Sequence, residues 1–126
     1  MPHCLLIVDD DRDLNEMVKR YALQQGYVVH QAFDGGAALE CVRAVRPDLV
    51  LLDITMPVLD GRDVLRQLKA DPATREVTVM VFSARGDQND RRVGLELGAI
   101  DYVEKPFSLA QLMGKIAYTL SQRERA

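Results

Sequence analysis

The sequence predicts an α/β protein with a parallel sheet, and three observations support this prediction. Short apolar runs alternate along the chain with segments in which apolar residues recur at helical spacing. The central run is continuously aliphatic, which is typical of a strand covered by helices on both faces of the sheet. The length of 126 residues, with 48% hydrophobic and 28% charged residues, is typical of one globular domain. We therefore expect five strand–helix units in a single domain spanning residues 1–126.

The first half of the chain predicts three strands and two helices. Strands are expected at residues 5–8, 27–32 and 48–53, because these are short apolar runs bounded by polar or turn-forming residues. Gly26 ends the first helix, and Asp34 caps the second, which stops before a proline. The apolar residues of the two helices recur at helical spacing: Leu14, Met17, Val18, Tyr21 and Ala22, then Ala38, Leu39, Val42 and Val45.

The second half predicts two more strands, at residues 77–82 and 100–104. Asp60-Gly61 opens a third helix, which the next aspartate–proline pair ends. The fourth helix, at residues 87–97, contains a glycine and a β-branched valine, so its helix propensity is low and we expect it to move most readily. The last helix begins with a capping box formed by Ser108 and Gln111, and its apolar residues are Leu109, Leu112, Met113, Ile116 and Leu120.

Charge and hydropathy exclude several classes of function. The formal net charge is −3, whereas proteins that neutralise many phosphates usually carry a basic excess, so we expect no direct binding of nucleic acid. No apolar stretch approaches the ~18 residues of a membrane span, and no cationic segment precedes the first apolar run. Cys4 and Cys41 lack other ligands at metal-binding spacing, so we expect small core residues in a reduced compartment. A cytoplasmic protein without membrane contact is the resulting expectation.

Reactive polar residues lie at the carboxyl ends of four of the predicted strands. They are Asp9, Asp10, Asp53, Ser83 and Lys105. Strands joined by helical crossovers run parallel, and ligands of such sheets bind at the carboxyl ends of the strands. Clustered carboxylates repel one another unless a cation lies between them, and hard oxygen ligands suit Mg²⁺. We therefore expect Asp10 and Asp53 to bind Mg²⁺, with Asp9 contributing directly or through water.

An alternative interpretation is that the acids at positions 9–11 only begin the first helix, where they favour the helix dipole and cap free amides. We prefer this interpretation for Asp11 and Asp13. It does not explain why Asp53 and Lys105 end other strands. A carboxylate at position 53 can attack a phosphorus centre in line and form an acyl phosphate if cations neutralise the transferred oxygens. Lys105 would supply one such cation and Ser83 a hydrogen bond, although a lone strand-terminal serine is more often a turn residue and a lone lysine usually solvated.

At these positions the chain resembles the receiver domain of two-component response regulators. The resemblance implies a doubly wound, flavodoxin-like (βα)5 fold with strand order 2-1-3-4-5. It extends over almost the whole chain, and the matching segments are Leu5 to Asp11, Asp34-Gly35, Ala38-Leu39, Pro47-Asp48, Leu51-Leu52-Asp53, Met56-Pro57, Asp60-Gly61, Ser83-Ala84, Gly98-Ala99, Asp101-Tyr102 and Lys105-Pro106-Phe107.

The resemblance also implies a function. Asp53 would accept a phosphoryl group from the phosphohistidine of a histidine kinase or phosphotransfer protein, and the domain would catalyse its own phosphorylation and dephosphorylation. Mg²⁺, or Mn²⁺ as the alternative ion, would be bound by Asp10, Asp53 and the backbone carbonyl of Thr55, with Asp9 assisting through water. Thr55 and Arg85 occupy family-variable positions near the site entrance, where Arg85 either shields the phosphate or faces solvent.

In the family that the chain resembles, phosphorylation changes the conformation of two residues. The hydroxyl group at Ser83, where threonine is commoner, turns toward the phosphoryl group, and the ring at Tyr102 rotates inward. The surface of the fourth helix, fifth strand and fifth helix then changes shape, and many receivers dimerise through this surface while others bind a separate partner. Tyr102 read by itself could equally be an ordinary packed strand residue.

The Lys105–Pro106 bond resembles the family's cis peptide, although the sequence allows either isomer. Residues 121–126 could begin a linker to an output domain or end a stand-alone receiver.

Two other classes of protein fit less well. A phosphatase of the haloacid dehalogenase type also uses a strand-terminal aspartate, a lysine and Mg²⁺, but it needs a second acid two residues after the nucleophile. Thr55 stands at that position, so the general acid–base residue is missing. A nucleotide or flavin binder would need a glycine-rich phosphate loop after the first strand, where this chain has three aspartates.

Overall fold

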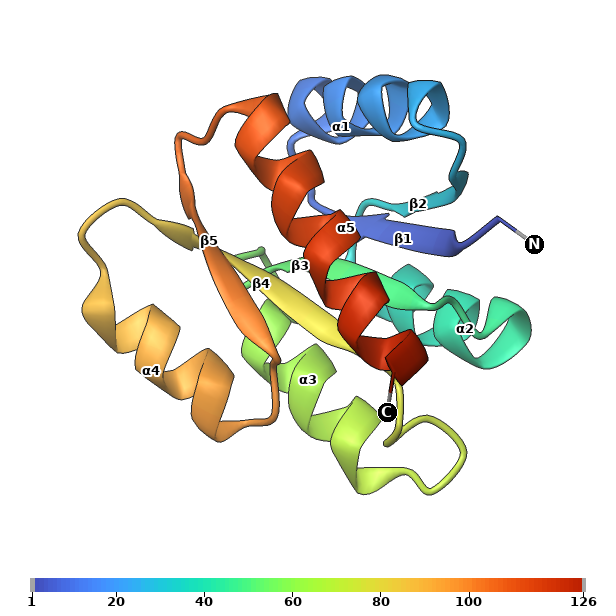
Figure 1. Cartoon of the computed structure of the whole chain (residues 1–126). Helices are drawn as coiled ribbons and strands as arrows, with labels where there is room; N and C mark the ends of the chain where they lie inside the picture. The colour runs from blue at the N-terminus through green and yellow to red at the C-terminus, as the bar shows by residue number, and fades with distance from the viewer. Residues whose placement is uncertain (1, 126) are drawn as a thin grey trace.

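The computed structural model describes residues 2–125, in which five strands alternate with five helices (Figure 1). In chain order the elements are β1 Cys4–Val8, α1 Arg12–Gln24, β2 Val28–Ala32, α2 Gly35–Val45, β3 Leu49–Asp53, α3 Gly61–Ala70, β4 Val79–Ala84, α4 Gln88–Glu96, β5 Asp101–Lys105 and α5 Leu109–Arg125.

The strands form one parallel sheet in the order β2-β1-β3-β4-β5. The predicted α/β fold and strand order are therefore confirmed. The order reverses between β1 and β3, and Val8 pairs with Ala32 on one side and with Leu52 on the other. Since parallel strands in this register end together, the polar residues that end β1 and β3 reach the same edge at the switch point of the sheet.

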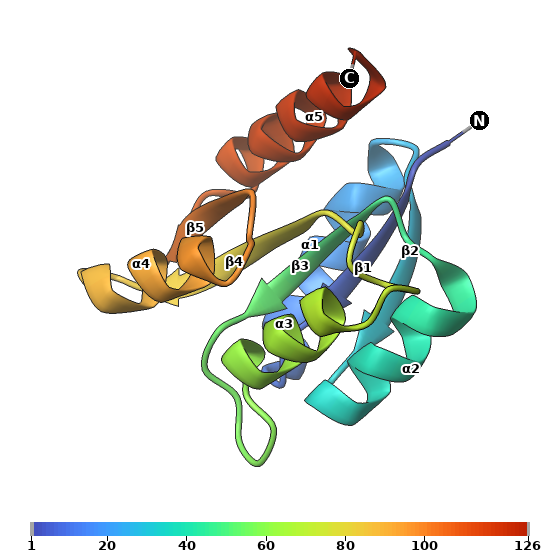
Figure 2. The same cartoon turned by 90° about the horizontal axis from the view of Figure 1, so that it is seen from below.

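Helices cover both faces of the sheet (Figure 2). Alternate residues of each strand point to opposite faces. Leu5 and Ile7 of β1 belong to a core with residues of α1 and α5, whereas Leu6 and Val8 belong to a core with residues of α2 and α3. All four of these β1 side chains are fully buried, which explains the continuously apolar strand sequence.

Three of the predicted helix starts are confirmed by hydrogen bonds. Asp34 accepts a hydrogen bond from the amide of Ala37 at 2.8 Å. Asp60 caps α3 by accepting hydrogen bonds from the two amides at positions 62 and 63. Ser108 accepts a hydrogen bond from the amide of Gln111 at 3.0 Å, as expected for the first half of a capping box.

The fourth strand begins and ends two residues later than predicted, because it spans Val79–Ala84 rather than residues 77–82. Val77 instead completes the turn after α3: its carbonyl oxygen accepts a hydrogen bond from the Lys69 ammonium at 2.8 Å. At the other end, Ala84 still pairs with β5. Ser83 therefore lies within the strand rather than after it, while the other four strands begin within one residue of the predicted positions.

The cysteines and the last helix complete the description of the fold. Cys4 and Cys41 are free thiols, and both are partly exposed. They therefore lie at the margin of the core, whereas we predicted that they lie inside it. Among residues 2–125, no helix is long and apolar enough to cross a membrane. Helix α5 continues to Arg125, so residues 121–125 of the predicted linker are helical, and residue 126 lies outside the described part of the chain.

Candidate functional site

Three charged residues from three strands meet at the carboxyl edge of the sheet. Asp9 follows β1, Asp53 ends β3 and Lys105 ends β5. The ammonium nitrogen of Lys105 lies 2.8 Å from Oδ2 of Asp9 and 3.3 Å from Oδ2 of Asp53. Strand alternation explains this convergence, because all three residues share the face of the sheet that α1 and α5 cover. The structure thus brings together residues that are 96 and 52 positions apart in sequence.

Asp9 is completely buried and held by several hydrogen bonds. Its Oδ1 accepts a hydrogen bond from the amide of Asp11 at 2.9 Å. The side-chain amide of Asn15, a buried residue of α1, lies 3.1 Å from the carbonyl oxygens of both Asp9 and Ala32. Asn15 therefore joins the ends of β1 and β2 beside the site. Our sequence analysis missed it, although a polar residue on the inward face of an apolar helical pattern is the signal that could have found it.

The acids at this edge fit a divalent cation. Asp9, Asp10 and Asp53 each offer a carboxylate oxygen, and these oxygens lie within 4.8 Å of one another. Asp9 and Asp53 are buried whereas Asp10 is exposed, so the cluster opens toward solvent. Thr55 is also exposed, and its amide donates a hydrogen bond to Oδ1 of Asp53 at 3.1 Å. Hard oxygen donors with access to water are the environment that Mg²⁺ prefers.

The electrostatic environment changes the pKa values of Asp53 and Lys105. Burial, together with the negative charge of Asp9, raises the pKa of Asp53 to about 6, although Lys105 and the Thr55 amide oppose this shift. Burial opposes the charge of Lys105, but its hydrogen bond to Asp9 and its attraction to both carboxylates outweigh burial, so the pKa of Lys105 is raised. Excess negative charge thus remains at Asp53, and an added cation would stabilise its ionised form.

This shift predicts that Asp53 destabilises the metal-free protein at neutral pH. Because its pKa is about 6 in the folded protein and ordinarily 3.8, ionisation inside the fold costs free energy that develops between these pH values. We expect Asp53→Asn to raise the free energy of unfolding by ~1–3 kcal/mol above pH 6, and by much less below pH 4. Urea unfolding in the presence of a chelator at several pH values measures this difference. A gain that is the same at every pH would contradict it.

The two residues expected to change conformation lie on the other face of the sheet. Ser83 lies on the same face as Val81, because the two are two residues apart in β4. Tyr102 of β5 lies on that face as well, because it pairs with Val81. Ser83 is buried, and within the described residues its hydroxyl group has no hydrogen-bond partner. The Tyr102 hydroxyl accepts a hydrogen bond from Arg91 of α4 at 3.4 Å, and Lys115 of α5 lies 5.4 Å from its ring centre.

Residues at the rim complete the site. The Lys105–Pro106 bond is cis, so the structure selects between the two isomers that the sequence allowed. Arg85 is exposed and lines an apolar pocket together with Lys105 and Phe107. It therefore faces solvent in this conformation while bordering the entrance to the site.

The start of α3 packs directly against the backbone of Asp53. The amide of Gly61 donates a hydrogen bond to the carbonyl oxygen of Ile54 at 3.1 Å. A β-carbon at position 61 would lie only 2.2 Å from the carbonyl oxygen of Asp53. This close approach requires glycine, and it fixes the loop between β3 and α3 over the site.

Sequence comparisons identify relatives of this chain. The family model described as response regulator receiver domain matches residues 5–117. The response regulator MprA of Mycolicibacterium vanbaalenii is 41% identical over 116 residues, which are 92% of this chain and 49% of that protein. The transcriptional regulatory protein PrrA of Mycobacterium tuberculosis is 44% identical over 119 residues, 94% of this chain and 50% of that protein. The chain thus spans about half the length of the curated relatives it matches.

Solved structures agree with this assignment. The receiver domain of NtrX from Brucella abortus has a TM-score of 0.86 and 30% identity, with 93% of this chain and 98% of that chain covered. The signal receiver domain of a signal transduction histidine kinase from Syntrophus aciditrophicus has a TM-score of 0.88 and 31% identity, with 98% and 94% covered. From the family match and these likenesses together, the chain belongs to the receiver domain family of two-component response regulators.

Proposed function

We propose that Asp53 is the phosphoacceptor of this receiver domain. The observation that carries the proposal is the position of the Asp53 carboxylate, which ends β3 with the Lys105 ammonium 3.3 Å away and two further acids beside it. A carboxylate oxygen of Asp53 would attack the phosphorus of a phosphohistidine on a histidine kinase or phosphotransfer protein. The new O–P bond forms as the P–N bond breaks, and the electron pair of that bond remains on the imidazole nitrogen, which is protonated afterwards.

The residues around Asp53 have separate tasks in this proposal. Asp9, Asp10, Asp53 and the carbonyl oxygen of Thr55 would hold Mg²⁺, or Mn²⁺ as the alternative ion. When bound, the ion supplies positive charge to the phosphoryl oxygens. Lys105 already bridges Asp9 and Asp53, so its ammonium is placed to exchange a carboxylate oxygen for a phosphoryl oxygen.

Residues on the opposite face of the sheet would change conformation in response to the phosphoryl group. The buried Ser83 hydroxyl is free to donate a hydrogen bond to a new phosphoryl oxygen, since no described residue bonds it. Movement of Ser83 would be accompanied by inward rotation of Tyr102, which contacts α4 and α5. The surface of α4, β5 and α5 would then bind an effector, an output domain or a second copy of the chain.

The domain would catalyse its own dephosphorylation but no turnover of a small-molecule substrate. Thr55 occupies the position where a haloacid dehalogenase phosphatase needs its second acid, and its side chain is exposed. Hydrolysis of the phosphoryl group would therefore depend on water entering beside Thr55 and Arg85. A histidine kinase partner also implies a cytoplasmic domain.

Incubation with acetyl phosphate and Mg²⁺ tests this proposal. We expect intact-protein mass spectrometry to show the mass of a single phosphoryl group per chain, in an adduct stable to acid and labile to base, as an acyl phosphate is. Because the phosphoryl oxygens need cationic charge, a chelator is expected to abolish the adduct. An adduct that forms equally well with chelator, or the absence of any adduct with Mg²⁺ present, would contradict the proposal.

A further inference from the structure

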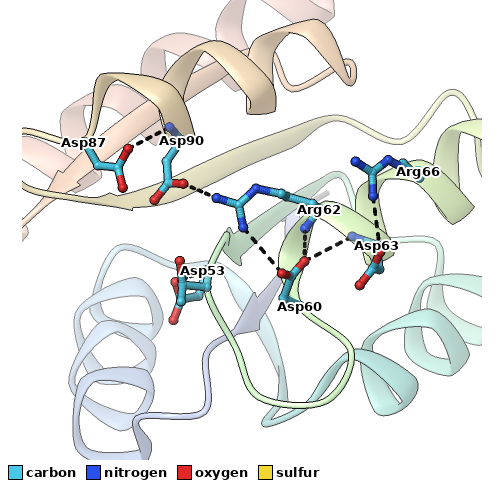
Figure 3. Close-up of polar contacts among 8 residues, drawn as sticks. Asp53, Asp60, Arg62, Asp63, Arg66, Asp87 and Asp90 are labelled. Atoms are coloured by element: carbon cyan, nitrogen blue, oxygen red, sulfur yellow. Dashed lines mark hydrogen bonds and ion pairs between the residues drawn. The ribbon is translucent and has the colours of Figure 1, made fainter.

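One arginine joins the N-terminal ends of α3 and α4 beside the site (Figure 3). Arg62 is the second residue of α3. One of its terminal nitrogens lies 3.4 Å from Oδ2 of Asp60, the residue that caps α3. The other donates a hydrogen bond to Oδ1 of Asp90 in the first turn of α4. We call the Arg62–Asp90 ion pair the helix clamp.

The clamp neutralises a carboxylate that is otherwise in an unfavourable environment. The Asp90 side chain is only 4% exposed, and Arg62 is 27% exposed. Burial raises the pKa of Asp90, the charge of Arg62 opposes this shift, and Asp87 and Asp60 add to it. Removing Arg62 would therefore leave a buried carboxylate beside two other acids, so the first turn of α4 could regain solvation only by moving away from α3.

Each residue of the clamp is linked to the phosphoacceptor site by a short segment of the chain. On the α3 side, Arg62 follows Gly61, whose backbone lies against Asp53 and Ile54. On the α4 side, the amide of Asp87 donates a hydrogen bond to the carbonyl oxygen of Ala84 at 3.1 Å. Ala84 is the residue after Ser83, so four residues separate Ser83 from the start of α4. The clamp thus ties together the two segments that leave the site from β3 and β4.

The clamp acts together with contacts between α4 and the sheet. Asp90 and Gly94 are the residues of α4 that are buried. At Gly94 the helix packs closely on the sheet, because a β-carbon there would lie 3.0 Å from a methyl group of Val81. In the N-terminal half of α4, Arg91 attaches the helix to β5, since it donates a hydrogen bond to the Tyr102 hydroxyl at 3.4 Å and lies 3.8 Å from Glu104. The clamp attaches the same half to α3 through the buried Asp90.

We propose that the Arg62–Asp90 clamp holds α4 in its resting position and thereby sets the equilibrium between the resting and signalling conformations. This inference rests on the proposed function. If the Ser83 hydroxyl moves onto a phosphoryl group at Asp53, the four following residues move with it and displace the first turn of α4. The clamp opposes that displacement, so weakening it leaves a larger fraction of molecules ready to bind a phosphoryl group or its mimic.

Two variants and a matched control test the clamp. Arg62→Met removes the cation, and Asp90→Asn removes the buried charge while keeping an acceptor at the same position. Arg66→Met is the control, since Arg66 lies on the same helix and pairs with Asp63 in an exposed ion pair at 3.2 Å. Hydrogen exchange of residues 88–96 is measured without ligand, relative to α5, and beryllofluoride with Mg²⁺ is then titrated into each protein.

We expect the amides of α4 to exchange at least about fivefold faster in both clamp variants, and beryllofluoride to bind them at least about fivefold more tightly than it binds the wild type. The control should match the wild type in both measurements. Combining the two clamp substitutions should add little, because they remove the same interaction. Arg62→Lys should restore part of the wild-type behaviour.

The outcomes separate this inference from the proposed function. If α4 exchanges no faster in the clamp variants than in Arg66→Met, the clamp does not hold α4. If α4 loosens but the variants bind beryllofluoride as the wild type does, the clamp does not set the switching equilibrium. If beryllofluoride fails to bind the wild type at all, the proposed function is wrong, and the role of the clamp in switching falls with it.

Discussion

Replacing Asp53 with asparagine is expected to abolish phosphorylation by acetyl phosphate. The amide has nearly the shape of the carboxylate and can still accept the hydrogen bond from the Thr55 amide. It lacks the nucleophilic, negatively charged oxygen that attacks phosphorus and that attracts a divalent cation and Lys105. Intact-protein mass spectrometry in the presence of Mg²⁺ should therefore show the wild type, but not the variant, gaining the mass of a phosphoryl group.

Asp13→Asn is the matched control for this substitution. Asp13 is an exposed acid in the first turn of α1 that we assigned to helix stabilisation rather than to the site. The same change of charge at this position should leave phosphorylation at the wild-type level. A phosphoryl adduct that persists in Asp53→Asn and maps to another residue would show that Asp53 is not the acceptor.

A second large effect is expected for Gly61→Ala. The added β-carbon would lie 2.2 Å from the carbonyl oxygen of Asp53 and 2.6 Å from the Cα atom of Ile54. Both are backbone atoms of a buried strand end, so no flexible side chain can move aside. The start of α3 must shift instead, and we expect the free energy of unfolding to fall by about 3 kcal/mol. Chemical denaturation with a chelator present measures this loss.

Gly114→Ala provides the opposite result from the same substitution. Gly114 lies within α5, is exposed, and has nothing within 4 Å of the position of a new β-carbon. Alanine there should stabilise the domain by ~0.5–1 kcal/mol, because glycine loses more backbone entropy in a helix. A loss at position 114, or no loss at position 61, would contradict the packing that the structure shows.

The positions of the acidic and basic site residues were predictable because they depend on local rules. A parallel sheet places all strand ends at one edge, so apolar runs that end in Asp9, Asp53 and Lys105 predict their convergence. Cap residues such as Asp34 and Asp60 were also predictable, since a cap depends on amides two or three positions away. The family resemblance added the strand order, which no local pattern specifies.

Other parts of the site depend on contacts between distant segments. The start of β4 was predicted two residues early because Val77 is apolar, but its amide and carbonyl groups bond Thr74 and Lys69 in the turn after α3. The helical pattern could have placed Asn15 on the inward face of α1, but its partners at the ends of β1 and β2 are known only once these strands lie beside it. Arg62 and Asp90 are 28 positions apart, and nothing in either local sequence pairs them.

The sequence by itself determined that acids and a lysine lie at the carboxyl ends of strands and that a hydroxyl group lies near the end of another, because approximate strand ends follow from short-range hydrophobic patterns. The tertiary structure alone decided which faces these groups occupy. Asp9, Asp53 and Lys105 lie on the α1–α5 face, whereas Ser83 and Tyr102 lie on the α4 face. The physical reason is that side chains alternate across a strand, so a shift of one residue in the pairing register changes the face. Such positions are fixed only when the helices and strands pack together.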